Sequence, residues 1–544
     1  MAPEDAVTDK PATPPRKQPF ALRADFARLA VHAPLAVFAA IAAAVVVAIV
    51  CRIGIKYSFN VNEGWNAYFA AAAWSGADLY PPPSALKMNT YLPLWFYLTG
   101  SLGSLVGDNI IAGRIIAGAA LLGTAGAVFL MVRAMTGVQR DAMTAVVAFL
   151  AMSGLFFGQY VAVDDPQWAG NLLMALAMLA VVRKASGEKG PIPIQLVIPL
   201  LLVAGLIKHN VMAAPASIAI YLLLFRRAEL PRFILWSIVG LAVVCAALFL
   251  MYGRSVFASM LYPRPYDFEV GWDQTVSHLI PFSPFLPVIL YLGYLAIRRI
   301  QPAMLIFIYA VASLVQGFVL SGGLDVDVNV FFDLAIACSI GLGLLQNAVA
   351  RLIADKALTW RAAFALLAWL GMNLTPLFLV PGDALRQARD TLAALAASPQ
   401  QADVAYIKGT PGGVLCENPA LCYWAGKDFW VDINTLKILV IGEPRLEADF
   451  IAKLERCSYP LIQLQNDWED EVDGPFTAGI LDALETHYTE IRRSAEAHYQ
   501  VPRPNCGAAA RGAIEPALVP RTGSSHPIAA SPIANFGFKA ALES

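Results

Sequence analysis

The chain has 544 residues, of which 58% are hydrophobic and only 15% are charged, so most of it cannot face water. This composition excludes an ordinary soluble enzyme, and a formal net charge of -1 excludes a basic nucleic-acid-binding surface and a polyacidic tail. Seven cysteines are too few for a disulfide scaffold in a chain of this length, and no Cys-x-x-Cys spacing indicates a zinc module.

Long apolar runs predict a polytopic bundle of transmembrane helices, because a helix of about 20 apolar residues crosses the hydrocarbon core of a bilayer. We place spans at residues 30–55, 109–132, 142–159, 166–182, 193–207, 211–225, 233–252, 279–297, 302–320, 331–348 and 359–380. The apolar stretch 91–106 contains proline and glycine, and we expect an interfacial or re-entrant helix there. The predicted fold class is mainly α, with about 11 to 13 helices in the bundle.

Basic residues occupy alternate loops between these spans, for example Arg133 and Arg140, then Arg183 and Lys184. Because Lys and Arg in short loops stay on the cytoplasmic side, this pattern predicts a cytoplasmic N-terminus and an external C-terminus. The external loops hold most of the loop carboxylates. Acidic residues contribute little to orientation, so topology does not explain this gathering and a chemical reason is needed.

Charged residues return after Pro381, where the membrane domain of residues 29–382 ends. We predict a small external α/β domain over residues 383–506, with strands in 413–416 and 459–464 and helices in 445–456 and 477–492. Residues 1–28 and 507–544 lack periodicity, and we expect them to be disordered.

The small domain contains four cysteines in a compartment that this topology makes oxidising. A disulfide between Cys416 and Cys422 and free buried thiols are both open interpretations. Four cysteines permit three pairings, and the sequence does not choose among them.

The first external loop contains Asn62-Glu63-Gly64-Trp65 and is about 35 residues long, which is typical of functional loops. A helix beginning at Asn62 would place the Glu63 carboxylate in its first turn, at the membrane boundary. A helix-capping acid stabilised by the helix dipole is the alternative interpretation of Glu63.

The second external turn reads Val163-Asp164-Asp165-Pro166. Two adjacent carboxylates at a bilayer edge are costly unless they are paired, hydrated or bound to metal. An N-cap at Asp165, followed by Pro166 at the first helical position, explains one of the two. It leaves Asp164 without a partner.

A third polar group, Lys208-His209-Asn210, interrupts a mostly apolar stretch. Snorkelling of Lys208 to the interface is one interpretation. Ionisable residues within the membrane nevertheless favour a functional role, and a cation here can bind a lipid-anchored phosphate. A fourth group, Asp325 and Asp327, is equally well explained as a hydrated loop.

Acids, cations and a site at the lipid interface are together what glycosyl transfer from a polyprenyl-phosphate sugar requires. The acceptor hydroxyl must lose a proton to a carboxylate as it attacks the anomeric carbon. The departing lipid phosphate must be held by Lys, Arg or a divalent metal. A transporter or lipid flippase is the alternative of a different class, although the chain shows no symmetric halves.

The order of these motifs resembles the GT-C superfamily of membrane glycosyltransferases. Its nearest branch contains bacterial aminoarabinose transferases and protein O-mannosyltransferases, and is labelled glycosyltransferase family 39. The resemblance covers roughly residues 30 to 350 and rests on the motifs at 62–65, 89–94, 113–114, 163–166 and 208–210.

The resemblance implies an inverting transfer from a polyprenyl-phosphate-linked sugar to a lipid, glycan or protein acceptor. It makes Glu63 the candidate base and gives Asp164 or Asp165 a role with the acceptor. Lys208, His209 and Arg264 are the candidates for binding the donor phosphate. It leaves open a divalent metal, Mg or Mn, with Glu63 and Asp164 as candidate ligands. Relatives commonly have an aspartate where this chain has Asn62, so the base would have to be Glu63 or the chain would be an inactive scaffold.

Overall fold

The computed structural model describes residues 24–188, 192–354, 369–375, 379, 382–396, 398–466, 474–504 and 506. For residues 24–32, 353–354 and 382–385 it describes the backbone alone. The termini predicted to be disordered lie outside the described residues, except that residues 24–28 belong to the first helix. Most of the span predicted at 359–380 also lies outside them.

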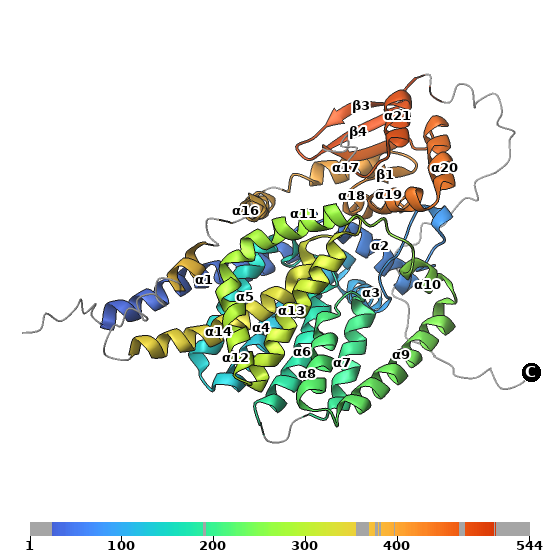
Figure 1. Cartoon of the computed structure of the whole chain (residues 1–544). Coiled ribbons are helices and arrows are strands. Elements are labelled where there is room, and N and C mark those ends of the chain that lie inside the picture. The colour runs from blue at the N-terminus through green and yellow to red at the C-terminus, as the bar shows by residue number, and fades with distance from the viewer. Residues whose placement is uncertain are drawn as a thin grey trace, which may run out of the picture.

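Long helices form the larger part of the molecule (Figure 1). They are α1 (Ala24–Ile53), α4 (Asn109–Thr136), α5 (Gln139–Phe156), α6 (Gln167–Ala185), α7 (Ile194–Ile207), α8 (Ala213–Phe225), α9 (Leu230–Tyr252), α12 (Leu286–Ile297), α13 (Gln301–Ser321) and α14 (Phe332–Ala354). Every span predicted up to 331–348 coincides with one of these helices. Seven helical stretches in the described part of the chain are long and apolar enough to cross a membrane. The predicted polytopic, mainly α fold is confirmed.

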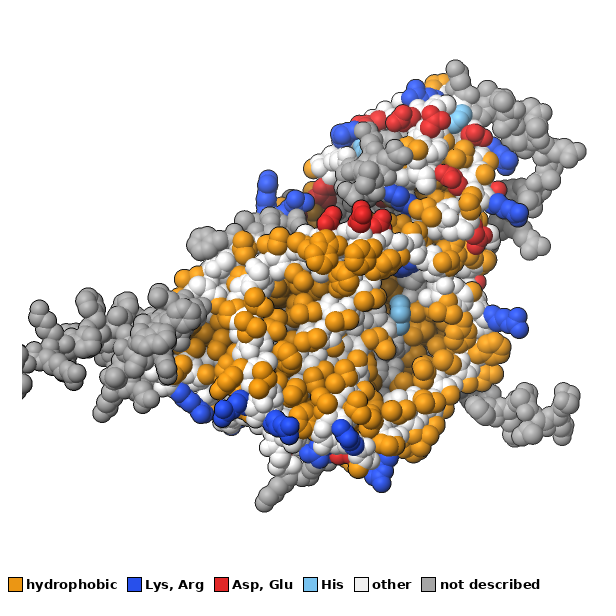
Figure 2. Space-filling model, viewed as in Figure 1, with side chains coloured by type: hydrophobic (Ala, Val, Ile, Leu, Met, Phe, Trp, Pro, Cys, Tyr) orange, Lys and Arg blue, Asp and Glu red, His pale blue; other side chains and the backbone are white. Residues whose placement is uncertain are grey.

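Helix α14 lies at the centre of the bundle and α9 lies at its edge. Residues 334–344 of α14 are almost all buried, whereas α9 exposes most of its apolar side chains, including Leu235, Ile238 and Leu250. A helix that is apolar on every face is stable only inside a protein or in lipid. Hydrophobic side chains therefore cover the flank of the bundle, while Lys and Arg line the end opposite the small domain (Figure 2).

The loops predicted to be external are built from short helices at the end of the bundle nearest the small domain (Figure 1). They are α2 (Asn62–Ser75), η1 (Pro83–Ala85), α3 (Leu94–Val106), η2 (Gly158–Tyr160), α10 (Ser255–Met260), α11 (Phe268–Leu279), η3 (Ile280–Phe285) and η4 (Val328–Phe331). The predicted helix start at Asn62 and the predicted short helix within 91–106 are both confirmed. Helix α11 exposes Phe268, Trp272 and Val276, and Asp267 caps its N-terminus by accepting from two backbone N–H groups.

The small domain contains one four-stranded sheet with the strand order β1-β2-β4-β3. Its elements are α16 (Gly382–Ala396), α17 (Gln401–Gly409), β1 (Val414–Cys416), α18 (Pro419–Trp424), α19 (Ile433–Gly442), α20 (Pro444–Glu455), β2 (Leu461–Gln465), α21 (Ala478–His487), β3 (Tyr488–Arg493) and β4 (Ala497–Pro502). Strands β1 and β2 are parallel, and the other pairs are antiparallel. The strands predicted at 413–416 and 459–464 and the helix predicted at 445–456 are confirmed.

The helix predicted over 477–492 is only half right. Helix α21 ends at His487, and the next residues form β3, which pairs with the unpredicted strand β4. Backbone pairing of Thr489 with Val501 and of Glu490 with Gln500 overrides the local helical periodicity. Such pairing depends on a partner segment that a single window of sequence does not contain.

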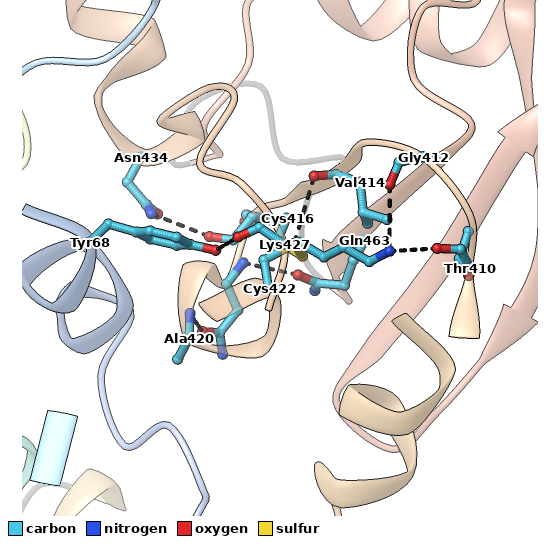
Figure 3. Close-up of a disulfide and its surroundings, with 12 residues drawn as sticks. Tyr68, Thr410, Gly412, Val414, Cys416, Ala420, Cys422, Lys427, Asn434 and Gln463 are labelled. Carbon is cyan, nitrogen blue, oxygen red and sulfur yellow. Dashed lines mark hydrogen bonds between the residues drawn. A yellow bond between two sulfur atoms is a disulfide. The ribbon is translucent and has the colours of Figure 1, made fainter. Parts of the chain in front are cut away.

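Two disulfides resolve the open cysteine pairing. Cys416 is bonded to Cys422, and Cys457 to Cys506. The first disulfide ties α18 to the end of β1 (Figure 3). Helix α18 packs against α2.

Side chains of α18 and its flanking loop connect the small domain to the bundle. Trp424 Nε1 donates to Asp108 Oδ2 at 3.0 Å, and the backbone N–H of Asn109 donates to Tyr423 Oη at 3.1 Å. Tyr68 Oη on α2 donates to the carbonyl oxygen of Lys427 at 2.6 Å. Gly64 of α2 meets the backbone of Ala420 so closely that a Cβ atom would overlap it.

Replacing Gly64 by alanine is expected to lower the free energy of unfolding by about 1–3 kcal/mol, because rigid backbone lies where the new methyl group must go. Gly126→Ala in α4 is the matched control, since a Cβ atom there meets nothing within 4 Å. The control is expected to keep or raise stability by roughly 0.5–1 kcal/mol. Thermal unfolding of the purified chain in detergent measures both. Equal midpoints for the two variants would contradict close packing of α18 on α2.

Candidate active site

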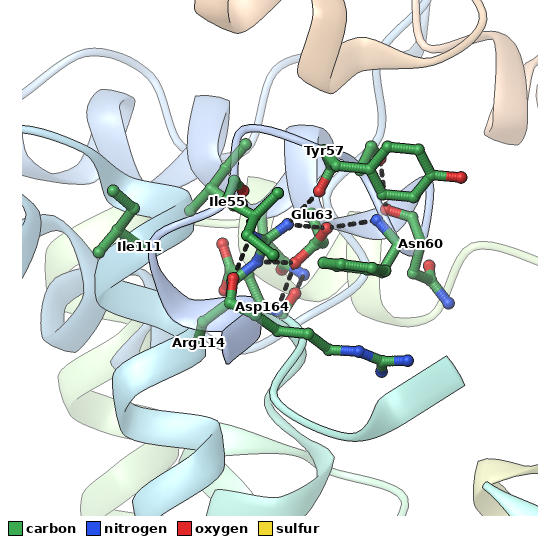
Figure 4. A network of polar contacts seen from close by, with 12 residues as sticks. Ile55, Tyr57, Asn60, Glu63, Ile111, Arg114 and Asp164 are labelled. Atoms are coloured by element: carbon green, nitrogen blue, oxygen red, sulfur yellow. Dashed lines mark hydrogen bonds and ion pairs between the residues drawn. The ribbon is translucent and has the colours of Figure 1, made fainter. Parts of the chain in front are cut away.

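Glu63 forms a fully buried ion pair with Arg114 of α4 (Figure 4). Arg114 Nε lies 2.6 Å from Glu63 Oε1, and Arg114 Nη2 lies 2.7 Å from Oε2. The guanidinium group also donates to the carbonyl oxygens of Arg52, Ile55 and Tyr57, at 2.5–2.8 Å. Arg114, on α4, therefore stabilises the turn that connects α1 and α2.

The Glu63 carboxylate accepts two further hydrogen bonds from backbone N–H groups. Phe59 donates to Oε2 at 2.9 Å, and Asp164 donates to Oε1 at 3.2 Å. Each oxygen thus accepts two donors, which fills the lone pairs of an ionised carboxylate. This bonding favours a role for Glu63 in holding the site together. A substrate proton or a metal ion would have to displace one of its donors.

Asp164 is also fully buried, but one of its oxygens is free. Oδ1 accepts from Trp95 Nε1 at 3.2 Å, whereas Oδ2 has no partner among the described residues. Its carbonyl oxygen accepts from Asn66 Nδ2 at 2.6 Å. The carboxyl group lies where a Cβ atom on Gly113 would be, so Gly113 makes room for Asp164 while the next residue, Arg114, binds Glu63.

Burial raises the pKa of Asp164 well above its usual range, and the nearby negative charges of Glu63 and Asp165 raise it further. Once ionised, a carboxylate with a raised pKa and a free oxygen accepts a proton more readily than an ordinary aspartate does. Because both Glu63 oxygens are occupied, Asp164 fits a base better than Glu63 does.

Asp165 is positioned by the start of α6. Its Oδ1 accepts from the Gln167 backbone N–H at 2.8 Å, while Oδ2 has no partner among the described residues. The Asp165 carboxylate thus accepts from the first residue of α6, but the N-cap position is Pro166 and α6 begins at Gln167, one residue later than predicted. Burial raises the pKa of Asp165, and the nearby Lys208 charge partly offsets the increase.

The three residues predicted to bind phosphate differ in exposure. Lys208, at the end of α7, is only 3% exposed, and its Nζ atom lies 3.7 Å from the ring centre of Tyr91. Arg264 is exposed and donates to Thr90 Oγ1 at 3.4 Å. His209 is exposed beside Lys208. Because Lys208 is buried over an aromatic ring, snorkelling does not account for it.

One short segment, residues 90–95, brings the candidate groups together. It contacts Arg264 through Thr90, Lys208 through Tyr91 and Asp164 through Trp95. The base candidate and two of the phosphate-binding candidates thus contact the same short segment. Arg114, Gly113 and Trp95 were not assigned these roles from sequence. An arginine within an apolar run was the signal that could have singled out Arg114.

A divalent metal would have few protein ligands here. No group of three or more His, Cys, Asp and Glu side chains suited to a metal occurs within the part of the chain that the structure describes. The free oxygens of Asp164 and Asp165 are the available carboxylate ligands. Mg²⁺ is commonly held by one or two carboxylates together with water and substrate phosphates, so these residues fit only a metal that the substrate helps to bind. Participation of Mg or Mn stays a prediction.

No protein-family model matches the chain, and no curated protein matches it. Among solved structures, ArnT from Cupriavidus metallidurans bound to undecaprenyl phosphate is similar over 87% of this chain and 99% of that chain, with a TM-score of 0.55 and 14% identity. The apo state of ArnT has a TM-score of 0.53 and 14% identity, over 87% of this chain and 98% of that chain. An oligosaccharyltransferase of Archaeoglobus fulgidus has 13% identity over 86% of this chain and 72% of that chain. Its TM-score of 0.46 is too low to indicate a shared fold.

The chain therefore has the fold of ArnT, as a polytopic helical bundle followed by a small C-terminal domain. Placement in glycosyltransferase family 39 is not confirmed. Because one fold supports many activities, the function has to be argued from the site.

Proposed function

We propose that this chain is a membrane glycosyltransferase that moves a sugar from a polyprenyl-phosphate donor to an acceptor hydroxyl, with inversion at the anomeric carbon. The observation that carries the proposal is the arrangement around residues 90–95. There a buried carboxylate with a free oxygen, on Asp164, and a buried cation, Lys208, contact the same segment. The binding of undecaprenyl phosphate by ArnT, which has the same fold, supports a lipid-linked donor.

In the proposed reaction, Asp164 Oδ2 accepts the proton of the acceptor hydroxyl as its oxygen attacks the anomeric carbon. The bond between that carbon and the donor phosphate oxygen breaks, and the polyprenyl phosphate leaves with the negative charge. Lys208, helped by Arg264, stabilises this charge where it develops. The Glu63 carboxylate, held by Arg114, accepts from the backbone N–H group of Asp164 and so orients Asp164.

We further propose that the reaction takes place at the external face of a bacterial inner membrane, with the N-terminus in the cytoplasm. The Lys and Arg side chains at the end of the bundle opposite the small domain support this orientation (Figure 2). The acceptor would be a lipid, glycan or protein of the envelope that reaches the site from the external side, beside the small domain.

Lys208→Ala tests the donor site. It is expected to weaken binding of a polyprenyl-phosphate sugar by about 10- to 100-fold, since a buried charge-assisted contact contributes about 1.5–3 kcal/mol. Lys87→Ala is the matched control, because Lys87 also lies over an aromatic ring, that of Phe429, but at 5.7 Å and in contact with the small domain. Titration of the lipid into the purified chain measures both. Unchanged affinity in Lys208→Ala would show that Lys208 does not bind the donor phosphate.

A further inference from the structure

Asp432 of the small domain is a buried carboxylate that contacts the bundle. It is 0% exposed and lies directly before α19. Its Oδ2 accepts from Trp65 Nε1 at 2.8 Å and from Thr435 Oγ1 at 2.6 Å, and its backbone N–H donates to the Leu86 carbonyl oxygen at 2.9 Å. The second oxygen, Oδ1, has no partner among the described residues.

A buried carboxylate with an unpaired oxygen is costly for stability alone. Burial raises the pKa of Asp432 to about 6, so the group is largely ionised at neutral pH. A charged acceptor makes a stronger hydrogen bond to the indole N–H than a neutral one. Burial of the Asp432 carboxylate therefore costs stability, but the same carboxylate makes a strong hydrogen bond that fixes the Trp65 indole.

Trp65 links Asp432 to the candidate phosphate-binding lysine. The Trp65 and Tyr91 rings contact edge to face, with their centroids 5.0 Å apart. The face of Tyr91 carries the Lys208 ammonium group at 3.7 Å. A direct series of contacts thus runs from the small domain through Trp65 and Tyr91 to Lys208. Trp65 also stands next to Asn66, which binds the backbone of Asp164.

We propose that Asp432 is a positioning residue, contributed by the small domain, that sets the place of the Lys208 ammonium group through Trp65 and Tyr91. The inference rests on the proposed function above. With the indole held by Asp432, its edge supports the Tyr91 ring in the orientation that presents a face to Lys208. Without that hydrogen bond, Trp65 can turn, and Tyr91 loses one of the two rings against which it packs, the other being Phe96. The small domain thereby takes part in binding the donor.

The test is a titration of undecaprenyl phosphate into the full-length chain in detergent, with Asp432→Ala, Asp432→Asn and Trp65→Phe. Asp432→Ala and Trp65→Phe are each expected to weaken binding about fivefold, and the double variant no further, because both remove the same hydrogen bond. Asp432→Asn keeps an acceptor oxygen and should restore most of the affinity. In the Lys208→Ala background, Asp432→Ala should have no effect.

Thr435→Val is the matched control, because it removes the other donor to Oδ2 and leaves the Trp65 bond intact. It is expected to bind the lipid as the unmodified chain does. A loss in Thr435→Val equal to that in Asp432→Ala would mean that Asp432 only stabilises the start of α19, and would overturn the inference.

If the unmodified chain binds no undecaprenyl phosphate, the proposed function fails and this inference falls with it. If the unmodified chain binds the lipid and Trp65→Phe binds it equally well, only the role of Asp432 is overturned. Should Asp432→Ala not fold, Trp65→Phe and Asp432→Asn still decide the question.

Discussion

Asp164→Asn is expected to slow sugar transfer by about 10²- to 10⁴-fold while leaving polyprenyl-phosphate binding unchanged. Asparagine has the same shape and can keep the hydrogen bond from Trp95, but it does not accept a proton at neutral pH. The measurement is turnover of a polyprenyl-phosphate sugar by the purified chain, together with lipid titration. Asp165→Asn is the matched control, since an asparagine can still cap α6, and a loss of less than about tenfold is expected.

The pH dependence of transfer follows from the raised pKa of Asp164. A general base must be ionised, so the rate should fall as the pH drops through this pKa, well above the range of an ordinary aspartate. The raised pKa also means that the folded chain favours protonated Asp164. Its ionisation therefore lowers stability as the pH rises through the pKa, whereas Asp164→Asn escapes that loss.

Asp164→Asn should accordingly unfold at the same or a higher temperature than the unmodified chain at neutral pH. Loss of transfer in a well-folded variant would separate chemistry from stability. Full turnover in Asp164→Asn would remove the base from the proposal and favour another site or a transport function.

Arg114→Met is expected to destabilise the chain by about 3–5 kcal/mol, because it leaves Glu63 as a buried and unpaired charge. The substitution also removes the hydrogen bonds that the guanidinium group donates to three backbone carbonyl oxygens. Thermal unfolding in detergent at neutral pH measures the effect. Glu63→Gln should lose stability and transfer together, because it leaves Arg114 without its counter-charge.

Arg183→Met provides the matched control for the buried pair. Arg183 also pairs with a glutamate, Glu188, but their side chains are 48% and 42% exposed. Exposed ion pairs contribute about 0–1 kcal/mol, so little change is expected. An Arg114→Met chain as stable as Arg183→Met would show that the Glu63–Arg114 pair does not hold the site together. Glu63 would then be available as a base.

Much of the fold could be predicted from the sequence because a transmembrane helix satisfies its own backbone within one apolar run. The spans up to 331–348, the helix start at Asn62 and the short helix α3 were all found in this way. Strand β3 was missed, because its residues form a strand only through pairing with β4. The two disulfides were left open for a similar reason, since pairing depends on distances that spacing does not contain.

The candidate site was predicted as a set of residues, but their roles depended on contacts. Glu63 and Asp164 are both acids at the end of a span, and nothing in their local sequence distinguishes a base from a partner of arginine. The distinction comes from Arg114, 51 residues away from Glu63, and from Gly113 and Trp95, which enclose the Asp164 carboxyl group.

The sequence by itself determined that this protein is a bundle of membrane helices with acids and cations in the loops between them. Each apolar segment enters lipid on its own account, so its composition alone identifies it. Only the tertiary structure decided which carboxylate is fully bonded and which has a free oxygen. It also joined Asp432 of the small domain to Trp65. Burial and hydrogen-bond partners are supplied by segments far apart in the chain, so they exist only once those segments have packed together.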